Sequence, residues 1–408
     1  MKRRVVITGG YLVTALGNEW KEILPALKAG KNCVRYMEDW DIYDGMNTRL
    51  ACPIDFTMPD YPRQKTRGLA RVGQLALVSA DRAVINAGLN ADDPILKNGR
   101  CGLAYGSSSG GIDPLTDYYS VLIQKDAKKM TATTYIKAMP QTCAANIGVF
   151  FGITGRLITT NTACTSSSQA IGFAYEAVRD GVQDIMLAGG ADEMSPVHVT
   201  IFDTLFAASI KNDTPEKTPA AYDINRDGLV VGEGAGTLII EEYEHAKKRG
   251  ANIIAEIIGF GTNSDGRHIT SPSRATQSIA MKIALDDAKI DSSIIGYINT
   301  HGTSTKAGDI SESCATMDVF QRAVPASTLK NYLGHTLGAC GVIEAFISIY
   351  MMKEKWFCPN INLEEIDPEV APLDYITGSG RELETDYIMS NNFAFGGINT
   401  SLIFKNVK

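Results

Sequence analysis

Apolar runs rich in β-branched residues recur along the chain, and each ends in glycines and other small residues before a stretch with helical spacing. Five such runs are VVITGG (5–10), CGLAYGSSSGG (101–111), DIMLAGGADE (184–193), IIAEIIGFGTNS (253–264) and YINTHGTST (297–305). Continuous apolar runs predict strands buried on both faces, and the periodic stretches between them predict helices. The pattern therefore predicts an α/β protein with its functional residues in loops that follow the strands.

A weak boundary lies near residues 249–255. The stretch EEYEHAKKR (241–249) predicts a helix, and the strand after it starts a second series of elements that resembles the first. At 408 residues the chain is long enough for a core in each half. No long linker separates the two series, so we expect two halves, 1–251 and 252–408, that pack closely together.

Composition narrows the classes of function. A net charge of −7 gives no general basis for binding nucleic acid, and the eight cysteines form no CxxC pair that would indicate a redox dithiol or structural zinc. The basic start precedes an apolar run of only four residues, and the apolar stretch 345–352 is far below the ~20 residues that span a bilayer. We therefore predict a cytoplasmic protein that has no nucleic-acid partner and no membrane span.

The segment LITTNTACTSSSQAIGFAYEAVRDG (157–181) predicts a strand, a tight turn and a helix, with Cys164 in the turn. A thiol there meets the positive end of the helix dipole and free backbone N–H groups, which favour the thiolate and lower its pKa. Small residues on both sides leave room for a substrate. We interpret Cys164 as a nucleophile, and the alternative is a buried cysteine that only packs.

Two of the five histidines lie in loops bounded by glycine, His301 in NTHGTST and His335 in KNYLGHTLGACG. Glycines let the backbone approach a ligand and fix an imidazole at a turn, whereas the alternative is a turn histidine bonded only to backbone. His198, His245 and His268 lack this setting, and we expect them on the surface or in packing. No metal site is predicted, because no third ligand has a matching spacing.

Four motifs resemble those of elongating β-ketoacyl-(acyl carrier protein) synthases, the type I and II condensing enzymes. They are TACTSSS around Cys164, HGTST followed by GD, KNYLGHTLGACG, and the closing NNFAFGGINTS (391–401), in the family's order over essentially the whole chain. The resemblance implies a thiolase-like α/β fold, in which two similar βαβαβαββ halves form a five-layered αβαβα sandwich. The last two motifs are most similar to ketosynthases of bacterial aryl polyene pathways.

The resemblance also implies roles for individual residues. Cys164 would accept the acyl group from a carrier-protein thioester, while His301 and His335 would bind the malonyl carbonyl and stabilise the enolate as carbon dioxide leaves. Lys330 and Glu312 match the family's charged pair, which would hold the histidines in place; a purely structural ion pair is the alternative. No cofactor is implied beyond the phosphopantetheine arm of the carrier protein.

The closing motif implies a gate. Phe395 matches the family's gating aromatic, and Gly396 and Gly397 suit a loop that swings, although a core phenylalanine is the alternative. The backbone N–H groups of Cys164 and Phe395 would form the oxyanion hole. Ser109, in the GSSSGG loop, stands where type II enzymes usually carry a branched apolar residue, which predicts a larger acyl pocket for longer, rigid or unsaturated chains.

Carrier proteins are acidic, so an acidic enzyme needs a local cationic surface to bind one. The run RQKTRGLAR falls where the family binds its carrier, and QKDAKK would add a second edge from the other subunit; together they contain Arg63, Lys65, Arg67, Arg71, Lys125, Lys128 and Lys129. A solvated helix face is the alternative for each run. Family members are dimers, so we expect a homodimer or a heterodimer with a chain-length-factor-like subunit.

Other enzyme classes fit less well. A biosynthetic thiolase needs a second cysteine in the final glycine-rich loop, which NNFAFGG lacks, and initiating ketosynthases have asparagine where this chain has His335. A cysteine hydrolase needs a residue that orients its histidine, and none is evident. A non-catalytic chain-length partner would lack Cys164. Fatty acid elongation and specialised polyene synthesis both remain open as the pathway.

Overall fold

One large sheet runs through both halves of the protein. The computed structural model describes residues 2–407. The strands that the first half adds to the sheet are β1 (Val5–Val13), β4 (Cys101–Gly106), β5 (Leu157–Thr160), β6 (Ile185–Asp192) and β8 (Gly234–Glu242). The strands that the second half adds are β9 (Ala255–Ser264), β10 (Tyr297–Asn299), β11 (Pro325–Ser327), β13 (Asp374–Tyr375), β15 (Tyr387–Ala394) and β16 (Ile398–Asn406).

The two halves repeat one strand order. Read from the junction outwards, the first half runs β1-β8-β6-β4-β5, and the second runs β9-β16-β15-β10-β11 with β13 added at the edge. In each half the first strand is therefore followed by the fifth, fourth, second and third strands of the set. Antiparallel pairing of β1 with β9 joins the halves into a single 11-stranded sheet rather than two separate ones.

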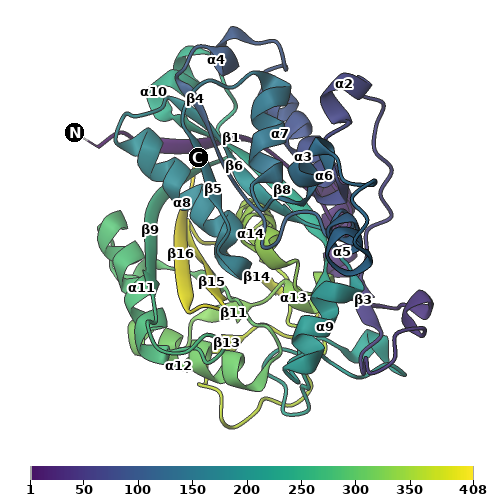
Figure 1. Ribbon diagram of the computed structural model, residues 1–408. Helices are drawn as coiled ribbons and strands as arrows, with labels where there is room; N and C mark the ends of the chain where they lie inside the picture. The colour runs from purple at the N-terminus through teal and green to yellow at the C-terminus, as the bar shows by residue number, and fades with distance from the viewer. Residues whose placement is uncertain (1, 408) are drawn as a thin grey trace.

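Helices cover the sheet in layers, and the two halves occupy different parts of the molecule (Figure 1). Helices α3 (Arg71–Asn86) and α7 (Thr142–Phe151) pack outside the first half, and α11 (Arg274–Ala288) and α12 (Lys306–Phe320) outside the second. Between the halves, α8 (Ser166–Arg179) and α14 (Cys340–Glu354) contact each other and strands of both. The predicted thiolase-like α/β fold with five layers is thus confirmed.

The sequence explains why α8 and α14 form the central layer. The α14 sequence CGVIEAFISIYMMKE is apolar on nearly all sides, as is typical of a helix surrounded by protein. On α8, a Cβ added to Gly172 would lie 2.2 Å from the ring of Phe260 on β9, so only glycine allows this close contact between the halves.

Shorter elements border the sheet. These helices are α1 (Trp20–Lys28), α2 (Arg63–Thr66), α4 (Pro94–Lys97), α5 (Leu115–Gln124), α6 (Ala132–Ala138), α9 (Pro196–Thr204), α10 (Tyr243–Lys248) and α13 (Lys330–Leu333). Two small sheets contain β2 (Arg35–Tyr36), β3 (Leu50–Cys52) and β7 (Val231–Gly232), and β12 (Trp356–Phe357) with β14 (Arg381–Glu382). Among residues 2–407, no helix has both the length and the apolar character needed to cross a bilayer.

The predicted functional residues follow the carboxyl ends of strands. Cys164 comes after β5, His301 after β10, Lys330 and His335 after β11, and Phe395 after β15. Strands β4, β5 and β6 are parallel to one another, as are β10, β11 and β15. Loops after parallel strands meet at one edge of a sheet, which brings these segments together.

Candidate active site

Cys164 lies in a single 3-10 turn (Ala163–Thr165) between β5 and α8, and 6% of its surface is exposed. The preceding Ala163 has φ +49°, in the left-handed region that non-glycine residues seldom adopt. Ser166 Oγ holds the turn, accepting the Thr162 N–H at 3.0 Å and donating to the Ala163 carbonyl at 2.7 Å. The order of strand, turn and helix agrees with the sequence prediction.

His335 contacts the thiol directly, with 3.0 Å between its Nε2 and the Sγ of Cys164. Its Nδ1 accepts the backbone N–H of Leu337 at 3.1 Å. A nitrogen that accepts a hydrogen bond carries no proton, so in the neutral ring the proton is on Nε2. We assign this tautomer from the Leu337 contact, and it makes His335 a hydrogen-bond donor toward the sulfur.

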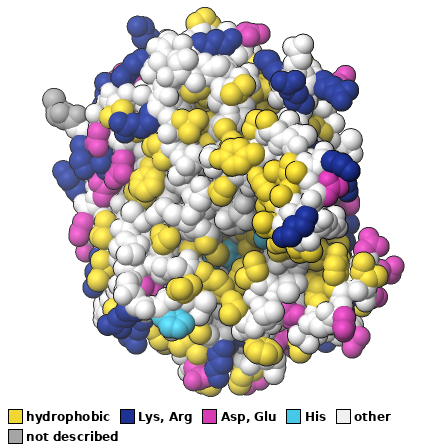
Figure 2. Space-filling model, in the orientation of Figure 1, with side chains coloured by type: hydrophobic (Ala, Val, Ile, Leu, Met, Phe, Trp, Pro, Cys, Tyr) yellow, Lys and Arg dark blue, Asp and Glu magenta, His cyan; other side chains and the backbone are white. Residues whose placement is uncertain are grey.

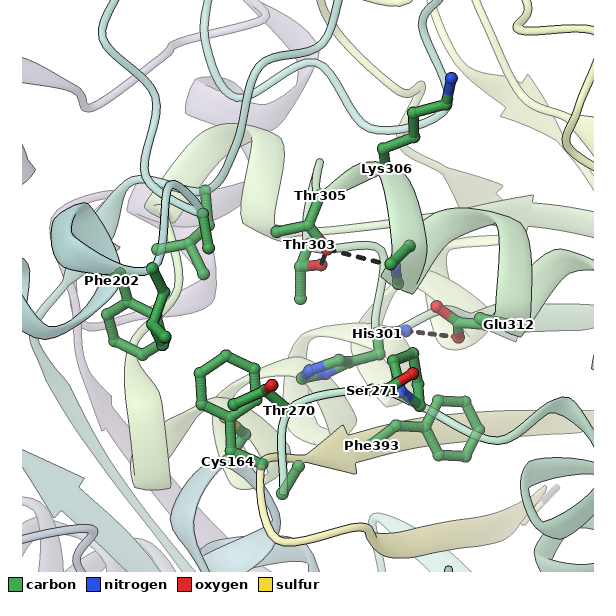
Figure 3. A pocket seen from close by; sticks show the side chains of 18 of the residues that line it. Cys164, Phe202, Thr270, Ser271, His301, Thr303, Thr305, Lys306, Glu312 and Phe393 are labelled. Carbon is green, nitrogen blue, oxygen red and sulfur yellow. Dashed lines mark hydrogen bonds between the residues drawn. The ribbon is translucent and has the colours of Figure 1, made fainter. Parts of the chain in front are cut away.

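His301 lies edge-on to His335, with 5.2 Å between the ring centroids. Its loop is held by Glu312, whose two carboxylate oxygens accept the N–H groups of His301 at 2.7 Å and Gly302 at 2.8 Å. Figure 3 shows this contact and the imidazole of His301 extending into the cavity toward Cys164. Glu312 therefore positions His301 through the backbone.

Lys330 does not pair with Glu312, which corrects the ion pair expected from the sequence. Its Nζ lies 2.5 Å from Oε1 of Glu344 on α14, and both side chains are almost completely buried. The other oxygen of Glu344 accepts the amide of Asn392 at 2.9 Å. The distance along the chain could not reveal this partner, but a single glutamate inside the apolar α14 sequence is the signal that could have done so.

Burial controls the protonation states at the site. It raises the pKa of the Cys164 thiol to about 11, although Lys330 and the backbone N–H groups of Phe395 and Cys164 act in the opposite direction. The lowered pKa expected for Cys164 is therefore wrong, because desolvation of the thiolate outweighs the effect of Lys330 and of these N–H groups. Burial and the charge of Lys330 hold the pKa of His301 and of His335 well below the usual range, so both imidazoles are neutral.

Phe395 lies against Phe202 of α9, with 5.5 Å between the ring centroids. The next two residues, Gly396 and Gly397, have φ of +87° and +71°, which favour glycine. A Cβ on Gly397 would also come within 2.7 Å of Asp265. Two consecutive glycines in the left-handed region thus follow the aromatic ring, and the swinging of this loop as a gate stays a prediction.

A cavity opens above Cys164 (Figure 3), and both catalytic candidates His301 and His335 line it. Both apolar and polar side chains line it, with Phe202 on one side and Thr303 and Thr305 on another (Figure 3): the apolar ones are Phe202, Leu205, Phe206, Ile269, Phe393 and Phe395, and the polar ones include Thr270, Ser271, Thr303, Thr305 and Lys306. Thr303 and Thr305 share a 2.8 Å hydrogen bond between their hydroxyls. The sequence reasoning did not assign these threonines, although they belong to the HGTST motif that it used.

Ser109 does not line this cavity. Its Oγ lies 2.7 Å from Nε2 of His198 on α9, one helical turn before Phe202. His198 is buried, as expected of a packing residue, but its hydrogen bond to Ser109 was not foreseen. The pair lies on the same face of α9 as Phe202, the residue against which Phe395 packs.

The predicted basic residues fall into two groups. Figure 2 shows basic side chains over the region of α2 and near the end of α5, on the same face as a hollow with histidine at its base. Arg63, Lys65, Arg67, Lys125, Lys128 and Lys129 are exposed. Arg71 is half-buried and makes a bidentate ion pair with Glu233 at 2.7 and 2.8 Å. Arg71 therefore has a partner within the chain, which argues against a docking role.

Three possible metal ligands also meet at the site. One ligand atom each from Cys164, His301 and His335 lies within 4.8 Å of the others. These residues come from distant segments, so spacing along the chain gave no sign of the cluster. The ammonium group of Lys330, which affects the pKa of all three, opposes the binding of a cation there.

Comparison with known proteins gives consistent matches. The model of the β-ketoacyl synthase N-terminal domain matches residues 2–246, and that of the β-ketoacyl synthase C-terminal domain matches residues 254–364. Vibrio harveyi 3-oxoacyl-[acyl-carrier-protein] synthase 2 is 35% identical over 416 residues, covering 100% of this chain and 99% of the relative.

The chain is also similar to solved structures of ketosynthases. A β-ketoacyl synthase from Burkholderia phymatum is 53% identical, with a TM-score of 0.98 and 100% coverage of both chains. A Xenorhabdus doucetiae ketosynthase in complex with its chain length factor is 26% identical, with a TM-score of 0.82 and coverage of 99% of this chain and 98% of the other.

Proposed function

Because the chain belongs to the β-ketoacyl synthase family of condensing enzymes, we propose that Cys164, His301 and His335 carry its reaction. Cys164 accepts an acyl group from acyl carrier protein, and a malonyl group on a second carrier then extends it by two carbons with loss of carbon dioxide. The observation that carries this proposal is the meeting of one buried thiol with two neutral imidazoles from three separate loops.

The first step is a thioester exchange. The sulfur of Cys164 attacks the acyl carbonyl, the bond to the carrier thiol breaks, and the proton lost by Cys164 goes to the departing pantetheine thiolate. The negative charge that develops on the carbonyl oxygen needs donors in a dry site. The backbone N–H groups of Cys164 and Phe395 already act on the thiol, and we assign them this role.

In the second step, the malonyl carboxylate leaves as carbon dioxide and its bonding electrons form an enolate. His335 has a proton on the Nε2 that faces the sulfur, and a matching Nε2 proton on His301 would give the enolate oxygen two donors. The enolate carbon then attacks the acyl carbonyl, and Cys164 leaves as a thiolate that takes up one proton from solvent. Neutral imidazoles suit this step, because the enolate oxygen needs hydrogen-bond donors and no group has to remove a proton.

Movement of Phe395 would determine that acyl transfer to Cys164 comes before condensation with the malonyl group. Its ring rests on Phe202 at the apolar side of the cavity, and its glycine hinge lies beside the 265–273 segment, where Gly396 donates to the Ile269 carbonyl at 2.7 Å. Movement of the ring away from Phe202 opens a path for an acyl chain beyond the cavity. Its return closes that path and leaves the polar side, with Thr303 and Thr305, for the arm of the second carrier.

We assign carrier docking to the exposed basic residues near α2 and α5. Arg63, Lys65 and Arg67 have exposed side chains on or next to α2. Figure 2 shows basic side chains over the region of α2, on the face that carries the hollow, which suits an acidic carrier protein. Lys125, Lys128 and Lys129 form the second edge of this surface.

A second subunit would cover the apolar surface beside the docking face. Exposed apolar side chains gather on α5, α6 and α9: Tyr119, Leu122, Ile123, Tyr135, Ile136, Val197 and Ile201. Strand β5 ends the large sheet and has an unpaired edge within the described chain. An exposed edge with an apolar border supports pairing with another chain, either a second copy or a chain-length-factor-like subunit.

The cytoplasmic location and the aryl polyene pathway remain predictions.

The test is intact-protein mass spectrometry of the wild type and Cys164→Ala after incubation with acyl carrier protein carrying decanoate, followed by addition of the malonyl carrier. We expect an adduct only when Cys164 is present, and its loss as a carrier-bound β-ketoacyl chain appears. Release of the adduct as free acid would instead indicate a hydrolase. An adduct that forms equally on Cys164→Ala would refute the assignment of the nucleophile.

A further inference from the structure

The Ser109–His198 pair is a polar contact between the 106–111 loop and α9. Ser109 Oγ and His198 Nε2 are 2.7 Å apart, His198 is 4% exposed, and its Nδ1 has no hydrogen-bond partner among residues 2–407. Ser109 is partly exposed, and its oxygen has further hydrogen-bonding capacity that no described residue uses. A buried nitrogen without a partner is unusual and indicates a missing ligand group or a cost in stability.

The pair lies directly behind the gate. His198 and Phe202 are one turn apart on α9, and Phe202 separates the pair from the cavity of Cys164 by packing against Phe395. An acyl chain bound to Cys164 would run toward Ser109 and His198 if it passed Phe202 after movement of the Phe395 ring.

Asp192 holds the loop of Ser109 close to the catalytic centre. Its carboxylate accepts the hydroxyl of Ser107 at 2.8 Å and the N–H of Ser108 at 3.0 Å. It also accepts the N–H of Gly338 at 2.6 Å, on the loop that carries His335. One buried carboxylate thus joins the two loops, which gives the Ser109 hydroxyl a defined position relative to Cys164.

We propose that Ser109 and His198 select acyl chains that carry a hydroxyl group, an inference that rests on the proposed function. A purely hydrocarbon chain would cover the Ser109 oxygen and the His198 nitrogen without bonding to either. A hydroxyl both donates and accepts, so it satisfies Ser109 whichever nitrogen of His198 carries the proton. A carboxylate is disfavoured, because Asp192 already places a buried acid nearby.

The experiment offers the enzyme a mixture of decanoyl carrier and one hydroxydecanoyl carrier, with the hydroxyl moved one carbon at a time along the chain. Intact mass spectrometry then measures the ratio of the two adducts on Cys164. We expect about a tenfold preference for the hydroxylated chain at one position or at two adjacent positions, since a site that hydrogen-bonds a hydroxyl rejects the analogue without it.

Two variants and one control test the residues. Ser109→Ala and His198→Leu should each reduce the preference to less than about twofold. Ser108→Ala, in the same loop, should keep it, because alanine retains the backbone N–H that Ser108 donates to Asp192 at 3.0 and 3.1 Å. Ser109→Ala removes a partly exposed hydroxyl and keeps the test valid if His198→Leu does not fold.

The outcomes separate the two proposals. Adducts that form on Cys164 with no preference at any hydroxyl position would overturn the role of Ser109 and His198 and leave the proposed function intact. A preference that persists in Ser109→Ala would also overturn it. Absence of any adduct, from either chain, would refute the proposed function and the inference together.

Discussion

Replacing Lys330 by methionine tests the electrostatic arrangement of the site. Lys330 and Glu344 are 1% and 3% exposed, and their charged groups are 2.5 Å apart. Lys330→Met leaves the carboxylate of Glu344 buried without its cation, while Asn392 remains its hydrogen-bond donor. Removal of one partner of a buried pair costs about 3–5 kcal/mol, which is a large part of a typical unfolding free energy of about 5–15 kcal/mol.

Two double variants distinguish the observed Lys330–Glu344 ion pair from the Lys330–Glu312 pair that the motif predicts. Lys330→Met/Glu344→Gln removes both charges and keeps an acceptor for Asn392, so it should recover most of the lost stability. Lys330→Met/Glu312→Gln should not, because Glu312 contacts the backbone of His301 and not Lys330. The measurement is the free energy of unfolding in urea at neutral pH.

The second substitution should restore the free energy of unfolding without restoring the rate of condensation. Lys330 lowers the pKa of Cys164, His301 and His335, so the rescued Lys330→Met/Glu344→Gln protein should fold and still condense slowly. A loss of less than about 1 kcal/mol in Lys330→Met, or rescue through Glu312→Gln, would refute this account of the buried charges.

Three further predictions concern the thiol, the gate and the docking surface. Because the pKa of the Cys164 thiol is about 11, the rate of its alkylation by iodoacetamide should rise about tenfold per pH unit between about pH 8 and pH 10; a rate that levels off near neutral pH would restore the helix-dipole argument. Phe395→Ala removes the ring that closes on Phe202, so decarboxylation of the malonyl carrier without a bound acyl group should rise several-fold, measured as acetyl carrier; an unchanged rate would argue against gating. Arg67→Glu should raise KM for the carrier about fivefold at low salt, whereas Lys248→Glu on α10 should not, and equal effects would mean that only net charge matters.

Local signals were sufficient for the α/β class and for the three side chains to which we assign the reaction, whereas the thiolase-like layers were expected from the family resemblance. Apolar runs ending in glycine predicted strands followed by loops, and the structure places β4, β6, β9 and β10 within four of the runs, whereas β1 continues through the glycines of the first run to Val13. Glycine-bounded loops likewise singled out two histidines of five, and both line the cavity with the cysteine. Such signals succeed because the backbone geometry they report is set by residues adjacent in sequence.

The failures came from interactions between distant segments. The pKa of Cys164 depends on how completely other loops cover it, which a helix start does not reveal. Lys330 reaches Glu344 across the α13–α14 connection, and Arg71 reaches Glu233 beside β7, so the partner of each charge is decided by tertiary packing. A run of basic residues in the sequence likewise does not show which of them already has an ion-pair partner in the fold.

The hydrogen bonding of His335 also explains why this site suits condensation better than hydrolysis. A cysteine hydrolase needs an imidazole that removes a proton, from the thiol or from water, and a carboxylate or amide oxygen usually accepts a hydrogen bond from its other nitrogen. Here the backbone N–H of Leu337 donates to Nδ1, which leaves the proton on the Nε2 that faces Cys164. An imidazole held in this tautomer within a buried site donates well and accepts poorly. The same backbone contact that weakens His335 as a base thus prepares it to stabilise an enolate.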